Sequence, residues 1–219
     1  MPLLEIKALN RNTNLYVWKI TESFDELFRS VALKDVSLTR LEGMKAESHQ
    51  KGFLSVRRLL MEAGYNDFDL YYDEFGKPHL KDGKHISISH SNDFSVIVIS
   101  HENIGADLEI LKEKTLKLAP RFMDVAHLKG LSESDSIKKA TVVWGIKESV
   151  FKIKNEVGIS FKDHIFENDF TLADQKCTVE LRFNNKVECF TIIFDFIDEY
   201  VFVCAFNSLS LNDVNGPIH

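Results

Sequence analysis

The chain has 219 residues, of which 44% are hydrophobic and 27% charged, the balance of a globular protein with a sizeable core. Its formal net charge of -6 argues against nucleic-acid binding by bulk electrostatic attraction, so an anionic ligand would need a local basic site. The sequence has no apolar run long enough to span a bilayer and no signal-peptide core near Met1. We therefore expect a cytoplasmic protein that binds neither nucleic acid nor membrane.

The cysteines Cys177, Cys189 and Cys204 give no sign of a disulfide framework. Their number is odd, and none of them is spaced as CxxC. All lie in apolar, strand-like surroundings, where free cysteines commonly act as small buried hydrophobic residues. We expect all of them to be buried.

The first part of the chain combines short strands with one long helix. Apolar residues recur at helical spacing from Phe53 to Ala63, and Gly64 stands where a helix commonly ends. Residues 73–78 contain the glycine and proline of a turn. The predicted elements are strands at 3–9, 14–20 and 68–72 and a helix at 43–63.

A hairpin and a second long helix follow. The hairpin joins His85–Ser91 to Ser95–His101, and the apolar run Val96–Ile99 predicts a strand that is buried on both faces. The remaining predicted elements are a strand at 104–111, a helix near 134–154, an antiparallel meander from about residue 177 and a frayed tail from about residue 209.

The order of these elements repeats along the chain. Each half has a long helix followed, after a gap, by an apolar hairpin, although the residues themselves do not repeat. The repeat weakly indicates a duplicated α+β unit. No flexible linker separates the halves, so we expect residues 1–102 and 103–219 to form two tightly packed α+β halves, each with a long helix on an antiparallel sheet.

Asp107 and Glu109 lie two residues apart in a predicted strand, so their side chains share one face. Adjacent carboxylates repel each other, and a hard divalent cation would offset this repulsion. Gly105, just before the pair, permits a close backbone approach. A solvated strand edge, or salt bridges to a nearby lysine, would explain the same pattern.

The second predicted helix carries charged and aromatic side chains opposite an apolar face. The apolar face holds Val142, Val143, Ile146, Val150 and Ile153, and the opposite side holds Trp144, Lys147, Glu148, Phe151 and Lys152. One carboxylate and two ammonium groups could complete a metal site and hold phosphates. An ordinary Glu148–Lys152 pair, worth about 0.3–0.5 kcal/mol, is the simpler alternative.

Ser89, His90 and Ser91 end a strand beside a turn, where they could donate hydrogen bonds to a phosphate. A nucleophilic Ser–His pair is a second possibility, although neighbouring strand residues point to opposite faces and no GxSxG elbow is present. A polar hairpin end would also explain these residues. Lys77-Pro78 is equally open, as a plain turn or as a fixed loop that offers Lys77 to an anion.

Several motifs occur together in a fixed order: Phe75-Gly76-Lys77-Pro78, Ser87-Ile88-Ser89-His90-Ser91, Gly105-Ala106-Asp107-Leu108-Glu109, and Trp144-Gly145-Ile146-Lys147-Glu148 with Lys152. In this order and spacing, within about residues 45–163, the chain resembles the 4′-phosphopantetheinyl transferase superfamily. It resembles the two-domain type that activates surfactin-like peptide synthetases.

The resemblance implies two similar α+β halves related by a pseudo-twofold axis, with coenzyme A in the cleft between them. It also implies an enzyme, a holo-[acyl-carrier-protein] synthase that depends on Mg²⁺. Such an enzyme transfers the 4′-phosphopantetheine group of coenzyme A to a serine of an apo acyl or peptidyl carrier protein and releases 3′,5′-ADP. By this resemblance, the Mg²⁺ ligands are Asp107, Glu109 and Glu148.

The resemblance assigns the catalytic roles to Glu148 and Lys152. Glu148, or a metal-bound water, would accept the proton of the carrier serine, and Lys152 would hold the pyrophosphate and help 3′,5′-ADP to leave. Family members usually carry basic residues in the helix before the Lys-Pro loop, where Lys45, His49 or Lys51 would substitute here. The residues expected to bind coenzyme A are Lys45, Lys77, Pro78, Ser89, His90 and Lys152.

Other functions remain compatible with the sequence. One is a catalytically weak protein on the same fold that binds coenzyme A or a carrier protein. Another is an Mg²⁺ phosphohydrolase that uses the same carboxylates on water. Because carrier proteins of this class are generally acidic, we expect a basic docking face at Lys45, Lys51, Arg57 and Arg58. Because the two halves of one chain can form a cleft without a second copy of the chain, we expect a monomer.

Overall fold

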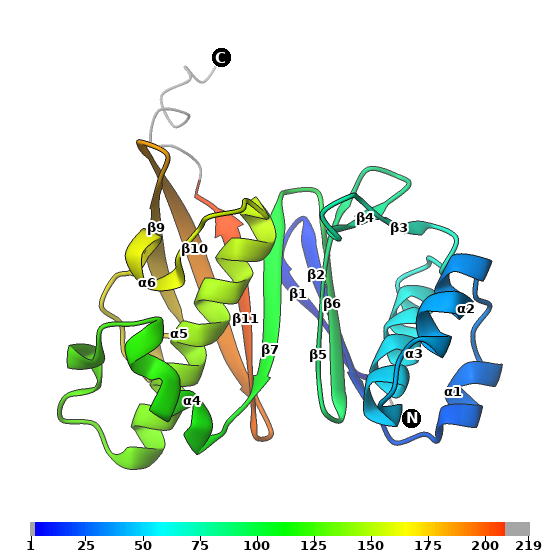
Figure 1. Cartoon of the computed structure of the whole chain (residues 1–219), viewed down its shortest axis with the longest axis horizontal. Coiled ribbons are helices and arrows are strands. Elements are labelled where there is room, and N and C mark those ends of the chain that lie inside the picture. Colours follow the sequence, from blue (N-terminus) through cyan, green and yellow to red (C-terminus); the bar gives the residue numbers. More distant parts are fainter. Residues whose placement is uncertain (1–2, 209–219) are drawn as a thin grey trace.

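The computed structural model describes residues 3–208 as an α+β fold with two antiparallel sheets (Figure 1). The six-stranded sheet has the order β1-β2-β6-β5-β4-β3, and the five-stranded sheet has the order β7-β11-β10-β9-β8. A long helix packs on each sheet, so the predicted fold class of two similar α+β halves is confirmed. The predicted tail from about residue 209 lies outside the described residues.

The first sheet is complete before the second begins. Its elements are β1 (Leu3–Asn10), β2 (Thr13–Lys19), α1 (Phe24–Arg29), α2 (Asp35–Glu42), α3 (Glu47–Glu62), β3 (Leu70–Tyr72), β4 (Pro78–Leu80), β5 (His85–Ser91) and β6 (Phe94–Ser100). The second half contains β7 (Ile104–Ile110), α4 (Glu113–Leu118), α5 (Glu133–Lys154), α6 (Phe161–His164), β8 (Ile165–Glu167), β9 (Lys176–Phe183), β10 (Lys186–Ile197) and β11 (Tyr200–Asn207). Short 3₁₀ turns lie at Ala119–Arg121, Val125–Leu128 and Leu172–Asp174.

In the first half, α3 packs its apolar face onto the six-stranded sheet. The residues that it buries against β2, β5 and β6 are Phe53, Leu54, Val56, Leu59 and Leu60. The helix predicted at 43–63 is confirmed, but it begins at Glu47 because α2 ends at Glu42, with Gly43 as its C-cap, and a short connection follows. The patterns did not predict α1 and α2, although Ser23 and Glu26 form a capping box at the start of α1.

In the second half, α5 lies very close to the sheet. A Cβ atom on Gly105 of β7 would lie 1.9 Å from the backbone oxygen of Ser149. A Cβ atom on Gly145 of α5 would lie 2.6 Å from a methyl carbon of Val203 on β11. Any larger residue would push the helix outward, so these glycines set how closely α5 approaches β7 and β11. The close backbone approach predicted at Gly105 is confirmed.

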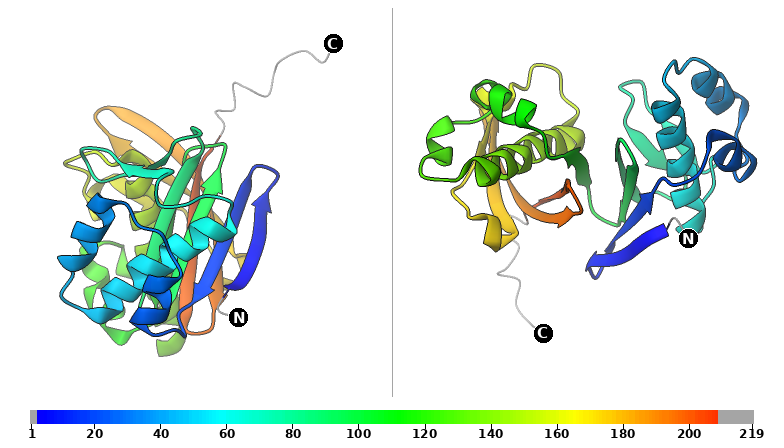
Figure 2. Two further views of the ribbon diagram at one scale, coloured as in Figure 1. Left: turned by 90° about the vertical axis from the view of Figure 1, so that its right-hand side faces the viewer. Right: turned by 90° about the horizontal axis from the view of Figure 1, so that it is seen from below.

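A further core joins the two halves. On β6, Val96 and Val98 face this shared core, whereas Ile97 and Ile99 face α3, so the predicted burial of this strand on both faces is confirmed. The Ile104 face of β7 enters the shared core, together with one face of β11. The right-hand view of Figure 2 places α3 and α5 on opposite outer sides, with strands of both sheets between them. The two halves therefore meet through their strands.

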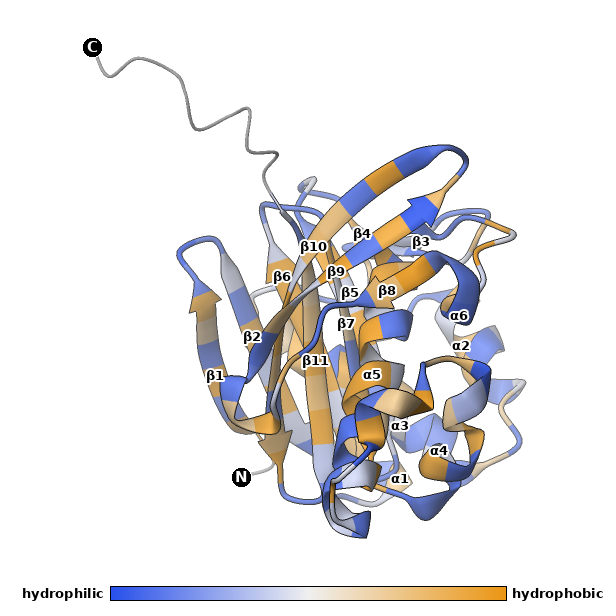
Figure 3. Cartoon of the chain, turned by 90° about the vertical axis from the view of Figure 1, so that its left-hand side faces the viewer, coloured by the Kyte–Doolittle hydropathy of each residue, from blue (hydrophilic) through white to orange (hydrophobic). Residues whose placement is uncertain are grey.

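The C-terminal meander is confirmed as β9, β10 and β11. Hydrophobic and hydrophilic residues alternate along β9 and β10 (Figure 3). This alternation corrects one prediction, because Cys189 lies on the outer face of β10 and is exposed, whereas Cys177 is half-buried and Cys204 buried. Within residues 3–208, no helix combines the length and the apolar character needed to cross a membrane.

Candidate active site

A cavity of about 390 Å³ lies between the two halves. Lys77, Pro78 and His90 line it from the first half, and Glu148 and Lys152 line it from the second. These residues come from a turn, from two strands and from a helix much later in the sequence. The fold therefore brings several of the predicted site residues to one place.

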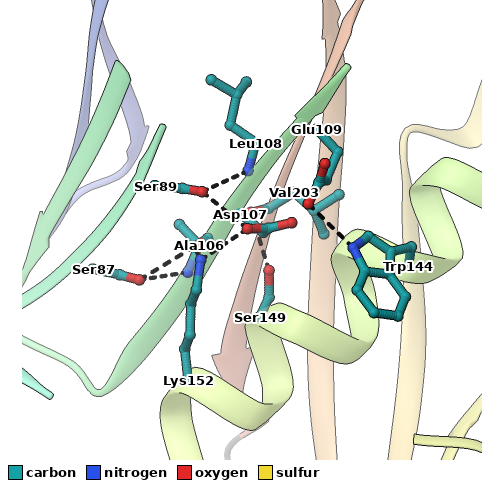
Figure 4. A network of polar contacts seen from close by, with 10 residues as sticks. All are labelled: Ser87, Ser89, Ala106, Asp107, Leu108, Glu109, Trp144, Ser149, Lys152 and Val203. Carbon is teal, nitrogen blue, oxygen red and sulfur yellow. Dashed lines mark hydrogen bonds and ion pairs between the residues drawn. The ribbon is translucent and has the colours of Figure 1, made fainter. Parts of the chain in front are cut away.

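Asp107 is the centre of a polar network next to this cavity (Figure 4). It lies on β7, faces α5 and is 4% exposed. Its Oδ1 accepts hydrogen bonds from Ser89 Oγ at 2.9 Å and from Lys152 Nζ at 2.8 Å. Its Oδ2 is buried without a hydrogen-bond partner among the described residues. A buried acceptor left unpaired costs about 1–3 kcal/mol, so this oxygen would gain from a bound cation.

Two serines of β5 connect the halves at this point (Figure 4). Ser87 Oγ accepts the N–H of Ala106 at 2.7 Å, and Ser89 Oγ accepts the N–H of Leu108 at 3.2 Å. Because β5 and β7 belong to different sheets, these hydroxyl groups replace the backbone hydrogen bonds of a ladder. The β5 and β7 motifs, separate in the sequence, are therefore in direct contact.

Lys152 crosses from α5 to β7. Its ammonium donates to the backbone oxygen of Ala106 and to Asp107 Oδ1, each at 2.8 Å. Among residues 3–208 its salt-bridge partner is Asp107 and not Glu148. The simple Glu148–Lys152 helix pair is therefore not formed, and Glu148, one turn earlier, faces the cavity.

The pKa values of both glutamates are raised. Burial first, and then the negative charge of Asp107, raises the pKa of Glu109 to about 7, although the indole N–H of Trp144, 3.1 Å from Oε1, opposes the shift. The same two causes raise the pKa of Glu148, and Lys152 opposes them. A higher pKa makes a carboxylate a stronger proton acceptor near neutral pH. Both groups would also be stabilised as anions by an added cation.

Lys77 reaches across to the C-terminal end of α5. Its ammonium donates to the backbone oxygen of Ile153 at 2.8 Å, and its own backbone N–H donates to Asp73 Oδ1 at 2.9 Å. Burial, as the main cause, lowers the pKa of Lys77; the negative charge of Asp73 opposes this shift, and the positive charge of Lys154 adds to it. The turn at 73–78 is therefore a fixed loop whose lysine contacts the other half.

His90 packs against α3 at a glycine. A Cβ atom on Gly52 would lie 3.0 Å from Nδ1 of His90, so a larger residue would displace the ring. The ring of His49 lies 6.3 Å away between centroids. Desolvation first, and then the neighbouring charges of His49 and Lys152, lower the pKa of His90. A lowered pKa favours the neutral ring, which can donate one hydrogen bond into the cavity.

Arg40 is a cavity residue that the sequence patterns missed. It lies on α2, with its guanidinium carbon 4.7 Å from the ring centroid of Tyr72 and 6.0 Å from that of Phe53. Lys45, predicted for a role at this end, is exposed after α2 and is not among the lining residues. A usable signal was present, since Asp35 in the first turn and Arg40 in the last turn are the charge pattern of a short helix.

Two other basic residues lie differently from their predictions. Lys147 does not share the cavity side of α5, because it is 1% exposed and pairs with Glu167 on β8. Arg57 is 3% exposed and its Nε lies 3.0 Å from Asp67 Oδ1. The prediction of Arg57 in an exposed docking face is therefore wrong, since this residue holds the inside of the first half together.

Three curated proteins that are similar to this chain are all named as 4′-phosphopantetheinyl transferases. The chain is 28% identical over 123 residues to 4′-phosphopantetheinyl transferase gsp of Aneurinibacillus migulanus, over 55% of this chain and 50% of the relative. It is 28% identical over 138 residues to a 4′-phosphopantetheinyl transferase of Bacillus subtilis, over 60% of each chain. It is 29% identical over 92 residues to 4′-phosphopantetheinyl transferase Sfp of Bacillus subtilis strain 168, over 40% of this chain and 41% of the relative.

This similarity confirms the resemblance to the 4′-phosphopantetheinyl transferase superfamily and to its surfactin-type group. No family model matches the chain. The matched region spans about half the length of the 4′-phosphopantetheinyl transferases named above, namely 50%, 60% and 41%.

The superfamily resemblance implies Mg²⁺, and the donor chemistry here fits a hard cation. Asp107, Glu109 and Glu148 offer carboxylate oxygens, the ligands that Mg²⁺ prefers, and Asp107 Oδ2 is buried without a partner in residues 3–208. In the same residues, no group of three or more His, Cys, Asp or Glu side chains is gathered closely enough to hold a metal ion. Binding would therefore require the glutamate side chains to move toward Asp107.

Proposed function

We propose that the protein is a 4′-phosphopantetheinyl transferase that acts on coenzyme A and on an acyl or peptidyl carrier protein. The carrier serine oxygen forms a bond to the phosphorus that bears the phosphopantetheine arm. The bond from this phosphorus to the bridging oxygen of the pyrophosphate breaks, and 3′,5′-ADP leaves with that oxygen. The serine proton passes to a base of the enzyme. The names of the relatives and the cavity between the halves support this proposal.

Coenzyme A would lie along the cavity with its phosphates toward the basic groups of both walls. Arg40 and His90 are available from the first half, and Lys152 from the second. The Lys77-Pro78 loop would lie against the adenine end. Such a pose places the pyrophosphate near Lys152, whose positive charge would stabilise the negative charge that develops on the leaving group.

Asp107, Glu109 and Glu148 would hold Mg²⁺, which would neutralise and orient the reacting phosphates. Glu148 is the proposed proton acceptor for the carrier serine. It lines the cavity, and burial together with Asp107 raises its pKa, so it takes up a proton more readily than an exposed glutamate would.

One observation carries the proposal most directly. Asp107, with its unpartnered buried Oδ2, contacts Lys152, which lines the same cavity as Glu148. These residue types suit phosphoryl transfer, in which the protein mainly positions and stabilises charge.

The test is to incubate the purified protein with coenzyme A, Mg²⁺ and several apo carrier proteins, and to weigh the carriers by mass spectrometry. We expect a mass gain equal to one phosphopantetheine arm, abolished by EDTA. Hydrolysis of coenzyme A without any carrier would instead indicate a phosphohydrolase.

A coenzyme A-binding protein without turnover is the second candidate. The position of Lys45 favours this second candidate, because Lys45 does not line the cavity. Among the basic residues of 40–51, Arg40 is the one that lines it. Binding of coenzyme A by calorimetry, with no mass gain on any carrier, would support this second function.

We also infer that the carrier docks on the exposed basic residue Lys45 and on the half-buried Lys51, the part of the predicted docking face that remains after Arg57 is removed. Arg58 contributes less to it, because it pairs with Glu62 at 3.2 Å. We infer a monomer, because both walls of the cavity come from one chain.

A further inference from the structure

The contacts of Ser89 differ from the phosphate contact that its motif suggests. Its side chain is 9% exposed and lies between the two halves. Its Oγ accepts the N–H of Leu108 at 3.2 Å and lies 2.9 Å from Asp107 Oδ1. Figure 4 shows Ser89 pointing from β5 toward Asp107 on β7.

The hydroxyl of Ser89 has a single hydrogen, which limits the hydrogen bonds that it can donate. Asp107 Oδ1 also accepts a hydrogen bond from the ammonium of Lys152 at 2.8 Å, so this oxygen acts as an acceptor and not as a donor. The single hydrogen of Ser89 must therefore point at Asp107. A serine hydroxyl has one hydrogen, so Ser89 cannot donate to a phosphate while this contact lasts.

The contact fixes which oxygen of Asp107 is free. With Ser89 and Lys152 on Oδ1, Oδ2 remains buried and without a partner in the described chain. This free oxygen lies toward Gly145 of α5, where a Cβ atom added to the glycine would be 3.8 Å from it. The carboxylate is thus held in one orientation before any ligand arrives.

We infer that Ser89 is a positioning residue that orients Asp107 for a divalent cation, and that it does not bind the phosphates of coenzyme A. The inference rests on the proposed function, because it takes Asp107 as a cation ligand. Hydrogen bonds to metal ligands of this kind commonly change metal affinity by about 10–100-fold.

Ser87 provides a matched control on the same strand. It lies two residues earlier on the same face of β5, and its Oγ accepts the N–H of Ala106 at 2.7 Å. It is buried like Ser89, at 3% exposure. Within residues 3–208, its hydroxyl hydrogen-bonds only to backbone atoms of Ala106 and to no carboxylate. Ser87→Ala therefore removes a bond between the halves without touching Asp107.

The experiment compares the wild type with Ser87→Ala and Ser89→Ala in two binding measurements. Mn²⁺, which prefers the same oxygen ligands as Mg²⁺, is titrated with the protein alone and the free ion is followed by electron paramagnetic resonance. Coenzyme A is titrated by calorimetry in EDTA. Melting temperatures establish that both variants remain folded.

We expect Ser89→Ala to weaken Mn²⁺ binding about tenfold while Ser87→Ala leaves it unchanged. Metal-free binding of coenzyme A should be alike in both variants. Wild-type Mn²⁺ affinity in Ser89→Ala, or a loss of metal-free coenzyme A binding in Ser89→Ala alone, would overturn the inference and leave the transferase proposal standing. A wild type that binds neither Mn²⁺ nor coenzyme A would overturn both.

Discussion

The two walls of the cavity hold their charged groups in different ways. On the second-half wall, Lys152 is fixed by hydrogen bonds to Ala106 and Asp107. Behind this wall, Glu109, which is not among the lining residues, accepts a hydrogen bond from Trp144. On the first-half wall, Lys77 is fixed by its hydrogen bond to Ile153, but Arg40 lies over aromatic rings and forms no salt bridge within residues 3–208. Groups held in place before binding suit transition-state stabilisation, whereas a free guanidinium suits ligand capture. The difference predicts that the second wall controls turnover and the first controls affinity.

The largest expected effect is on the second wall. Glu148→Gln keeps the shape of the side chain but removes its ability to accept the serine proton. The amide is also a weaker ligand for a divalent cation than the carboxylate. We expect kcat for carrier modification to fall about 10²–10⁴-fold, with the metal-free affinity for coenzyme A little changed. Initial rates by mass spectrometry measure this, and Glu156→Gln, an exposed position just beyond α5, is the control. Near wild-type turnover in Glu148→Gln would remove Glu148 from the mechanism.

The first wall should respond in the opposite way. Arg40→Ala removes a cavity guanidinium that forms no salt bridge in the described chain, so the KM for coenzyme A should rise about 10- to 150-fold while kcat changes little. This corresponds to the loss of a hydrogen bond to a charged group, about 1.5–3 kcal/mol. Arg29→Ala, an exposed residue at the end of α1, is the control. A fall in kcat at unchanged KM would contradict the division between the walls.

The pH dependence of stability offers a smaller effect in the second half, at Glu109 beside Asp107. The pKa of Glu109 is raised from 4.5 to about 7, so the folded protein binds its proton more tightly than the unfolded chain does. The resulting stability is present below pH 4.5 and is lost as the pH rises to about 7. We expect Glu109→Gln to have a flatter melting-temperature profile across this range than the wild type. The exposed Glu113→Gln serves as the control, and equal slopes in all three proteins would contradict the raised pKa.

Sequence patterns predicted the second wall better than the first, for a physical reason. Strand period and helix period place Asp107, Glu109, Glu148 and Lys152 on defined faces, because β7 and α5 are regular over their whole length. These faces are local properties of the chain. Of the charged residues predicted on the outer side of α5, Lys147 is the one that lies elsewhere, because it is buried against Glu167. That partner belongs to a three-residue strand that no sequence pattern indicated.

The first wall depends on contacts that no local pattern contains. Arg40 lies on a helix of eight residues with weak amphipathic character, and its place over Tyr72 follows from how α2 packs. The sequence alone predicts a surface position for Arg57, because nothing near it in the sequence shows that Asp67 pairs with it. The hydrogen bonds of Ser87 and Ser89 to β7 likewise arise only when the halves meet.

The last prediction concerns the place where one wall contacts the other. Lys77 donates to the backbone oxygen of Ile153, one of the carbonyl groups at the end of α5 that have no partner within the helix. Lys77→Met keeps most of the aliphatic length and removes this bond. We expect the end of α5 to open more readily, by about 1 kcal/mol, which hydrogen exchange at residues 150–156 would detect.

Lys154→Met provides the comparison, because Lys154 lies on the same helix end but pairs with Glu188 of its own half at 2.6 Å. If Lys77 acts through α5, Lys77→Met should lower kcat, because Lys152 and Glu148 lie on the last turns of this helix. Hydrogen exchange at the end of α5 should then be faster in Lys77→Met and not in Lys154→Met. If exchange is unchanged and only the KM for coenzyme A rises, Lys77 acts on the ligand directly, and the α5 contact is incidental to the reaction.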